Sequence, residues 1–405
     1  MTTQFQIRND FPLLSQEVNG NPLVYLDSAA SSLTPQTVID RITRYYSQEH
    51  SNVHRGIHRL SQNATDAYES TRDEVQRFIN AKSRNEIVFT YGTTDSINLL
   101  AATLGSQVQS GDTILITEME HHANIVPWQE ITWKTGAELA FIPMDSNGDL
   151  DLDVMKDLLR NRRVKILALV HISNSLGTVN PVEEIIQIAH ENGTLVMIDA
   201  AQSAPHMPLD VQKIDCDFLV FSAHKVCGPT GFGILYGKEE LLNSLPPYRS
   251  GGSMIEKVEL TESTYQSSPF RFETGTPPIA SGIAFSESIA YYKTLGWEWI
   301  TRTEHELFAY AENRLKSISG LKLIGSPQKR AAVLPFVLEG IHGMDAGMVL
   351  DKKGFALRTG HHCTQPVLRH FSIASSIRAS FMFYNTKEEI DRFIVAIEET
   401  KAFFT

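Results

Sequence analysis

Lys225 occupies a position from which an amine could react with a carbonyl compound. It lies in the segment Ser222–Lys225 (SAHK), directly after the apolar run Asp217–Phe221 and before a turn that contains Gly228 and Gly231. A lysine held in a pocket there, with its pKa lowered by burial or by a neighbouring cation, is a nucleophile that forms Schiff bases. The alternative is an ordinary solvated loop lysine. The choice depends on what stands at the ends of the neighbouring strands.

An aspartate closes another apolar run, Leu195–Asp199 (LVMID). Burying the Asp199 carboxylate is costly unless it faces a cation. A protonated pyridine nitrogen is such a cation, and pyridoxal phosphate needs that partner to act as an electron sink. The alternative for Asp199 is a helix N-cap.

Small and hydroxyl-bearing residues follow the run Glu86–Thr90. Gly92 precedes Thr93 and Thr94 at the start of a predicted helix over 96–104. Backbone N–H groups and the helix dipole at such a position bind phosphate. The pattern predicts a phosphate cradle, although hydroxyl residues also cap helices that bind nothing.

Two further strand ends carry side chains that suit the same ligand. The run 113–117 leads to His121 and His122, and the run 165–170 leads to Asn174. Adjacent histidines can bind metals, but their neighbours lack the spacing of a standard site, so we expect no metal and favour an imidazole stacked on an aromatic ring. Because ligands of open α/β sheets bind at the carboxyl ends of strands, the five strand ends together predict one cofactor pocket.

The chain has three cysteines, too few and odd in number for a disulfide framework. That usage fits the reducing cytoplasm. Polar, turn-prone residues on both sides of Cys363 favour a reactive thiol over a buried inert one. Cys216 begins an apolar strand and is expected to be structural, and the role of Cys227, two residues after Lys225, stays open.

The composition is that of a globular protein and argues against nucleic acid and membranes as partners. The 405 residues are 42% hydrophobic and 20% charged, with a formal net charge of −11. An acidic chain lacks the basic footprint that binds a phosphate backbone. No run reaches the roughly 18 apolar residues needed to cross a membrane, and residues 1–12 lack a secretory core. We therefore expect a cytoplasmic protein.

Short apolar runs alternate with amphipathic segments over the first two thirds of the chain. Several runs are continuous, as in strands buried on both faces, which predicts an α/β fold with a mostly parallel, helix-covered sheet. The last third, with a long helix over 297–318 and a closing helix over 387–403, has the profile of a smaller α+β domain. We predict a large domain at 18–295 and a small domain formed by 1–17 with 296–405. The predicted strands are 86–90, 113–117, 138–144, 165–170, 195–199, 217–221, 233–236, 332–337, 355–358 and 376–381.

Eight segments spread over nearly the whole chain resemble the SUF-type (group II) cysteine desulfurases, which are fold-type I pyridoxal phosphate enzymes of the class V aminotransferase group. The His-His-Cys and His-His-Ala-Asn segments are specific to this group, whereas Ser-x-His-Lys occurs throughout the wider superfamily. The matching segments are Tyr25–Ala30, Val53–His58, Gly92–Thr94, Met119–Trp128, Asp199–Gln202, Ser222–Lys225, Gly275–Pro277 and Arg358–Cys363. The resemblance implies the fold-type I transferase fold, with a large sheet domain and a smaller C-terminal domain.

The resemblance also implies a role for each candidate residue. Lys225 would bind the cofactor covalently and move the substrate Cα proton, Cys363 would receive sulfur as a persulfide, and His121 would stack on the ring and transfer protons. The other cofactor contacts implied are Asp199 at the ring nitrogen, Gln202 at the phenolate oxygen, Thr93, Thr94, Ser222 and His224 at the phosphate, and Thr276 from the other subunit of a dimer. The substrate contacts implied are Arg378 with Asn174 at the carboxylate, and Arg358 and His54 elsewhere in the pocket.

The reaction implied is the conversion of L-cysteine to L-alanine, with the sulfur left on Cys363 for iron–sulfur cluster assembly. Two other activities stay open, a lyase reaction on L-selenocysteine and another class V reaction such as transamination. A non-catalytic binding role is a third alternative, against which the intact Lys225, Asp199 and Arg378 argue. The partners implied are a second copy of the chain, as a homodimer, and a SufE-like or SufU-like sulfur acceptor near the hairpin-like segment 249–260.

Three positions depart from the family pattern. Ala223 replaces a glycine, Val226–Cys227 replaces a bulky aliphatic residue and a tyrosine, and Pro278 replaces a frequent asparagine. None of them removes a catalytic group that the resemblance implies.

Overall fold

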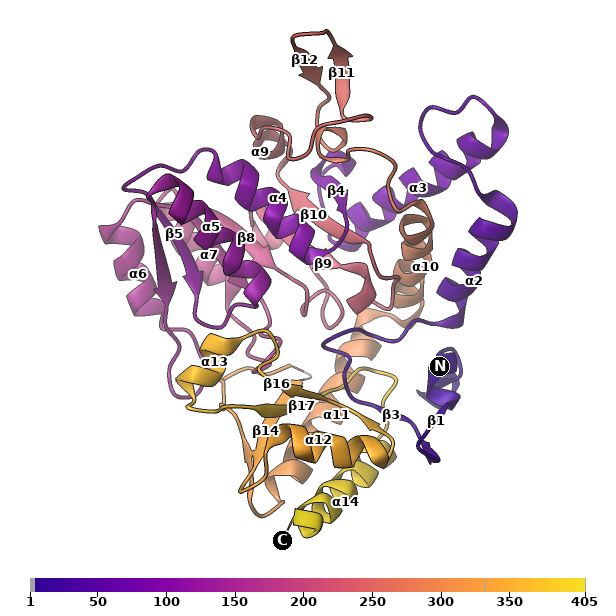
Figure 1. Ribbon diagram of the computed structural model, residues 1–405, viewed down its shortest axis with the longest axis vertical. Coiled ribbons are helices and arrows are strands. Elements are labelled where there is room, and N and C mark those ends of the chain that lie inside the picture. The colour runs from indigo at the N-terminus through magenta and orange to yellow at the C-terminus, as the bar shows by residue number, and fades with distance from the viewer. Residues whose placement is uncertain (1–3, 332, 405) are drawn as a thin grey trace.

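The computed structural model describes residues 4–331 and 333–404, and within them the largest feature is a seven-stranded sheet (Figure 1). The order across the sheet is β4-β10-β9-β8-β7-β5-β6, and β10 alone runs antiparallel to its neighbours. The strands are β4 Ile87–Thr90, β5 Thr113–Thr117, β6 Glu138–Ile142, β7 Val164–Val170, β8 Leu195–Asp199, β9 Phe218–Ser222 and β10 Gly233–Gly237.

Helices cover both faces of this sheet, which explains why its strands are continuous apolar runs. In β9, Phe218 and Val220 join an apolar core with α4 and α5 on one face, whereas Leu219 and Phe221 join the core on the other face. The helices of the first face are α4 Thr93–Gly105 and α5 Val126–Thr135. Those of the other are α3 Arg59–Phe78, α6 Leu152–Asn161, α7 Val182–Glu191 and α10 Ile279–Leu295, and α2 Gln36–Arg44 packs on α10.

A second sheet and three helices form a smaller unit at the other end of the molecule (Figure 1). Its four antiparallel strands lie in the order β13-β14-β17-β16 and share a separate apolar core with the helices. The elements are α11 Trp297–Lys316, β13 Leu321–Leu323, β14 Val333–Leu338, α12 Gly343–Lys352, β16 Arg358–Gly360, β17 Ser376–Ser380 and α14 Lys387–Phe404.

One early segment of the chain belongs to the smaller unit. β3 (Val24–Tyr25) pairs in parallel with β15 (Phe355–Ala356), and Leu26 lies in the core of that unit. The sequence placed everything from residue 18 in the large domain. A two-residue strand is too short to show a periodic pattern, so its pairing was not predictable from the residues alone. The domain limits otherwise stay a prediction.

The predicted strands of the large sheet agree with the structure to within two residues. The single strand predicted at 355–358 is instead two strands, because β15 pairs with β3 whereas β16 pairs with β17. Residue 332, the first of the predicted strand 332–337, lies outside the described residues, as do residues 1–3 and 405 of the predicted small domain.

A hairpin of β11 (Ile255–Val258) and β12 (Ser263–Tyr265) projects from the end of the molecule opposite the smaller unit (Figure 1). The other short elements are α1 Gln4–Arg8, β1 Glu17–Val18, β2 Asn21–Pro22, α8 Val211–Ile214, α9 Glu239–Ser244 and α13 Gln365–His370. None of the helices in the described part of the chain is long and apolar enough to span a membrane.

Candidate active site

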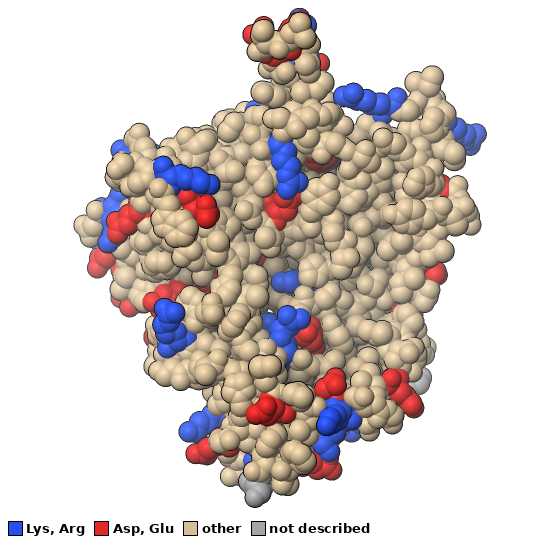
Figure 2. All heavy atoms as spheres, in the orientation of Figure 1, with Lys and Arg blue, Asp and Glu red and all other residues tan. Residues whose placement is uncertain are grey.

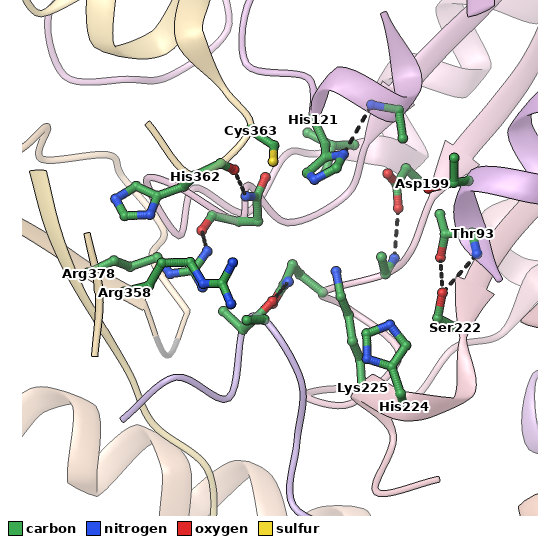
Figure 3. Close-up of a pocket in the computed structure, with 18 residues that line it drawn as sticks. Thr93, His121, Asp199, Ser222, His224, Lys225, Arg358, His362, Cys363 and Arg378 are labelled. Carbon is green, nitrogen blue, oxygen red and sulfur yellow. Dashed lines mark hydrogen bonds between the residues drawn. The ribbon is translucent and has the colours of Figure 1, made fainter. Parts of the chain in front are cut away.

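A cavity between the two sheets, at the carboxyl ends of the large sheet's parallel strands, holds twelve of the fourteen residues predicted to form the site. Its volume is about 230 Å³, and Figure 2 shows basic side chains inside the hollow at the centre of this face. In Figure 3 the side chains of Cys363, His121 and Lys225 point toward the middle of the cavity. The predicted residues that line it are Thr93, Thr94, His121, Asn174, Asp199, Gln202, Ser222, His224, Lys225, Arg358, Cys363 and Arg378.

Hydroxyl groups and a helix N-terminus form one end of the cavity. The backbone N–H of Thr93, in the first turn of α4, donates to Ser222 Oγ at 2.8 Å, and the two hydroxyl groups lie 2.8 Å apart. Gly92 precedes the helix with φ of 142°, which a side chain rarely adopts, and an added Cβ would lie 3.4 Å from Ser222 Oγ. The backbone can thus approach an anion closely at this end.

Buried acceptors lie deeper in the cavity. Asp199, at the end of β8, is only 3% exposed, and its Oδ1 accepts the backbone N–H of Ala201 at 2.9 Å. Burial raises the pKa of its carboxyl above the ordinary value, while Lys225 and the Ala201 hydrogen bond oppose this. Gln202 donates from Nε2 to the Ala29 carbonyl at 2.6 Å, and its Oε1 has no partner within the described residues. This arrangement suits a cationic ring with polar substituents.

Lys225 and His121 are both held toward their neutral forms. Burial lowers the pKa of Lys225 to about 8, Asp199 opposes that shift, and Arg378 adds to it. Burial lowers the pKa of His121 to about 4, and Lys225 contributes. The His121 Nδ1 accepts the backbone N–H of Ala123 at 3.1 Å, so the neutral ring carries its proton on Nε2. Burial, followed by Lys225, likewise lowers the pKa of His224 to about 4.

Two arginines from the small sheet form the opposite end of the cavity. Arg378, on β17, is 2% exposed and donates from Nη1 to the Asn174 carbonyl at 2.9 Å and from Nη2 to Asp27 Oδ1 at 3.0 Å. Arg358, on β16, donates to both oxygens of the same Asp27. The Nε of Arg378 has no partner within the described residues. A free donor on a buried guanidinium can bind a carboxylate.

Cys363 is the exposed member of the three cysteines, and it follows β16 in a tight turn. Cys216 and Cys227 are buried, and burial raises the pKa of the Cys227 thiol to about 12 and that of the Cys216 thiol still further. Asn174 Nδ2 donates to the His362 carbonyl at 2.8 Å, and the Asn174 carbonyl accepts from Arg378. Asn174 therefore positions both the cysteine turn and the Arg378 guanidinium.

The structure does not bring His54 and Thr276 into the cavity of their own chain. The Nε2 of His54 forms a hydrogen bond with Glu69 Oε1 on α3 at 3.0 Å, and His54 lines a second cavity with Glu273 and Gly275. Its backbone is left-handed, with φ of 74°. Thr276 is exposed on the loop before α10.

The family model for class V aminotransferases matches residues 24–393. The chain belongs to the class V aminotransferase family. Curated class V relatives include a probable cysteine desulfurase of Synechocystis, 50% identical over 403 residues that cover 98% of this chain and 96% of the relative. Another probable cysteine desulfurase, from Halalkalibacterium halodurans, is 47% identical over 400 residues, and the match covers 98% of this chain and 98% of the relative.

Solved class V structures agree closely with this chain. The cysteine desulfurase CsdA of Escherichia coli superimposes with a TM-score of 0.92 at 36% identity, covering 100% of this chain and 99% of that one. The apo cysteine desulfurase of Thermococcus onnurineus superimposes with a TM-score of 0.94 at 40% identity, and the match covers 99% of each chain. The fold-type I fold predicted from the sequence is therefore confirmed.

Pyridoxal phosphate, the cofactor expected for a class V enzyme, fits the residues present. The cavity has a helix N-terminus and hydroxyl groups for a phosphate, a buried carboxylate with no side-chain cation bonded to it for a ring nitrogen, and a partly buried lysine for an aldehyde. The unpartnered Gln202 Oε1 marks a further ring contact. No group of acidic, histidine or cysteine side chains in the described residues could hold a metal ion.

Sequence reasoning assigned no role at the site to three residues that the structure places there. Glu120 is fully buried and accepts from Thr117 Oγ1, Asn124 Nδ2 and the Val170 backbone N–H, so it ties the His121 loop to β7. Asp27 joins the two arginines. His122 contacts the cysteine turn. Their positions within the matched segments 25–30 and 119–128 were the available signal.

Proposed function

We propose that the protein is a pyridoxal phosphate-dependent cysteine desulfurase that converts L-cysteine to L-alanine and keeps the sulfur as a persulfide on Cys363. One observation carries the proposal. The exposed thiol of Cys363 lines the same cavity as the Lys225 amine and the buried Asp199 carboxylate. Transamination has no use for such a thiol, whereas sulfur transfer requires one. The relatives named as cysteine desulfurases support the same assignment.

The arginines and the lysine bind and activate the amino acid. Arg378, helped by Arg358, binds the substrate carboxylate through donors that the protein leaves free. Lys225, with its pKa lowered to about 8, takes the proton from the substrate Cα near neutral pH. Pyridoxal phosphate, when bound, supplies an electron sink for the negative charge left at that carbon.

Cys363 and His121 then serve the sulfur transfer. The Cys363 thiolate attacks the substrate sulfur, so that an S–S bond forms and the C–S bond breaks. The electron pair of the broken bond stays with the substrate carbon, which takes up a proton and becomes the methyl group of alanine. His121, neutral and protonated on Nε2, is placed to exchange a proton with the substrate.

The Cys363→Ala variant tests the assignment. We expect sulfide and alanine formation from L-cysteine, measured with a reductant, to fall roughly a hundredfold or more, while the visible absorbance of the lysine-bound cofactor stays. The matched control is Cys216→Ala, a buried cysteine outside the cavity, which keeps the activity. A Cys363→Ala enzyme that releases sulfide at the original rate contradicts the persulfide step.

The same assay separates the other activities. Parallel reactions with L-selenocysteine measure whether the chain prefers that substrate, and formation of a keto acid in place of alanine would indicate an aminotransferase. A purified protein without the cofactor absorbance would point to a non-catalytic role.

The proposal extends to partners. Thr276 is exposed and outside its own cavity, and the hairpin of β11 and β12 projects from the surface with Leu260 fully exposed. Both features support a homodimer in which one copy completes the cofactor site of the other, with a SufE-like or SufU-like acceptor taking the sulfur for iron–sulfur cluster assembly in the cytoplasm. Sedimentation gives the oligomeric state, and addition of each acceptor type to the sulfide assay gives the acceptor.

A further inference from the structure

His122 lies beside the active site without lining its cavity, and the reaction described above does not use it. It follows His121 in the loop between β5 and α5, and it is half-buried. Its ring contacts the turn that carries Cys363, since its Nε2 lies 3.1 Å from the backbone nitrogen of Gln365.

His122 contacts the cysteine turn at two points. Its backbone N–H donates to the Cys363 carbonyl at 2.8 Å, and its Nε2 accepts the backbone N–H of Gln365, the first residue of α13. One residue of the large domain therefore holds both ends of the three-residue segment that begins with the reactive cysteine.

The turn needs such support because its backbone is strained. His362 and Cys363 have φ values of 52° and 57°, and consecutive left-handed residues with side chains persist only where the surroundings hold them. Asn174 holds the His362 carbonyl from one side. On the other side the hydrogen bonds of His122 hold the segment that follows.

We propose that His122 is a positioning residue that fixes the direction of the Cys363 thiol by holding segment 363–365 against the large domain. The proposal deepens the desulfurase assignment. The effect of His122 on turnover rests on that assignment. The hydrogen bond from Gln365 requires an unprotonated Nε2. Burial, together with the neighbouring His361, lowers the pKa of His122, which keeps that nitrogen available at neutral pH.

The first experiment measures the reactivity of Cys363 with iodoacetamide in the cofactor-loaded enzyme without substrate. Because Cys216 and Cys227 are buried, alkylation of the folded chain reports Cys363. We expect His122→Ala to release the turn and speed alkylation about threefold or more, and His122→Gln, whose Oε1 can accept the same N–H, to stay near the original rate.

The second experiment measures persulfide formation in a single turnover. We expect His122→Ala to slow it about tenfold or more with little change in the KM for L-cysteine, and His122→Gln to recover most of the loss. The matched control is His370→Ala on α13, whose Nε2 lies 3.1 Å from the Asp145 carbonyl oxygen and whose Nδ1 lies near Glu118. Its alkylation and turnover rates stay unchanged.

The outcomes separate the two proposals. Original alkylation and turnover rates in His122→Ala, or a glutamine variant as altered as the alanine variant, overturn the positioning role. A wild-type enzyme that makes no persulfide from L-cysteine overturns the desulfurase assignment, and the alkylation series still decides the positioning role. Circular dichroism and the cofactor absorbance identify any variant that is misfolded. If His122→Ala is misfolded, His122→Asn replaces it, because the asparagine side chain is too short to reach the Gln365 backbone N–H.

Discussion

Asp27 determines how the substrate end of the cavity presents its positive charge. Its carboxylate accepts from both Arg358 and Arg378, so the two guanidinium groups share one anion and are not left facing each other unpaired. Burial lowers the pKa of Arg378, and Asp27 opposes that shift, so a further anion bound beside the guanidinium would stabilise its charged form. In the proposed reaction, the substrate carboxylate supplies that anion.

At the residue scale we expect Arg378→Lys to weaken substrate binding. A lysine keeps the charge but cannot donate at once to Asp27, to the Asn174 carbonyl and to a ligand in the planar arrangement of a guanidinium. The KM for L-cysteine should rise about tenfold or more, with a smaller change in kcat. A lysine variant with the original KM would show that Arg378 does not bind the carboxylate.

Single residues were predictable where chain order alone places them at a strand end. Asp199, Lys225 and Asn174 follow continuous apolar runs, so the parallel sheet had to bring them to one edge. Glu120 was not predictable in this way, because one of its partners, Val170, lies fifty residues away. The direction of the His54 side chain depends on its hydrogen bond with Glu69 of α3, which no local pattern encodes.

At the scale of elements, the turn between β4 and α4 places a helix N-terminus against the cavity. Gly92 allows this turn because its φ of 142° is poorly accessible to other residues. We expect Gly92→Ala to shift the first turn of α4 and lower the affinity for pyridoxal phosphate about tenfold or more, measured by titrating cofactor-free enzyme and following the visible absorbance.

Gly193 is the matched control for this substitution. It also has a left-handed backbone, with φ of 69°, and it ends α7 with no atom within 4 Å of an added Cβ. Gly193→Ala should lower the free energy of unfolding by about 1 kcal/mol and leave cofactor affinity unchanged. Equal loss of affinity in both variants would trace the effect to general destabilisation.

The elements of the large sheet were predictable because burial on both faces leaves a long apolar signature. The helices that cover it supply that burial, as the alternating partners of Phe218 and Leu219 show. The two-residue strands β3 and β15 were not predictable, since their pairing joins positions more than three hundred residues apart. The smaller unit therefore includes residues 24–26, which sequence patterning could not assign to it.

At the scale of the whole molecule, buried neutral histidines predict loss of stability in mild acid. Burial lowers the pKa values of His121, His171 and His224 to about 4 and that of His362 to about 3. Below the ordinary value of 6.5 the unfolded chain binds protons at these sites that the folded chain does not, so the free energy of unfolding falls as pH falls. The buried carboxyls with raised pKa values oppose this but are fewer, namely Glu120, Asp199 and Glu304.

His171 allows a direct measurement of this linkage, because it lies outside the cavity. The His171→Phe variant lacks the site at which the unfolded chain binds one proton more than the folded chain. The slope of the free energy of unfolding against pH should therefore flatten by about 1.4 kcal/mol per pH unit between pH ~6.5 and ~4. Urea titrations across that range measure the slope. An unchanged slope would mean that His171 is solvated and charged in the folded chain.

The position of Cys363 has a kinetic consequence. In the proposed reaction, a thiol that borders the cavity and also meets solvent would give the enzyme two separate exits, one for the amino acid product and one for the sulfur atom. Alanine can depart while the sulfur waits on the surface, and a reductant or acceptor can collect it without entering. Turnover therefore has two waiting times in series, and an acceptor shortens only the second, up to a plateau set by the first.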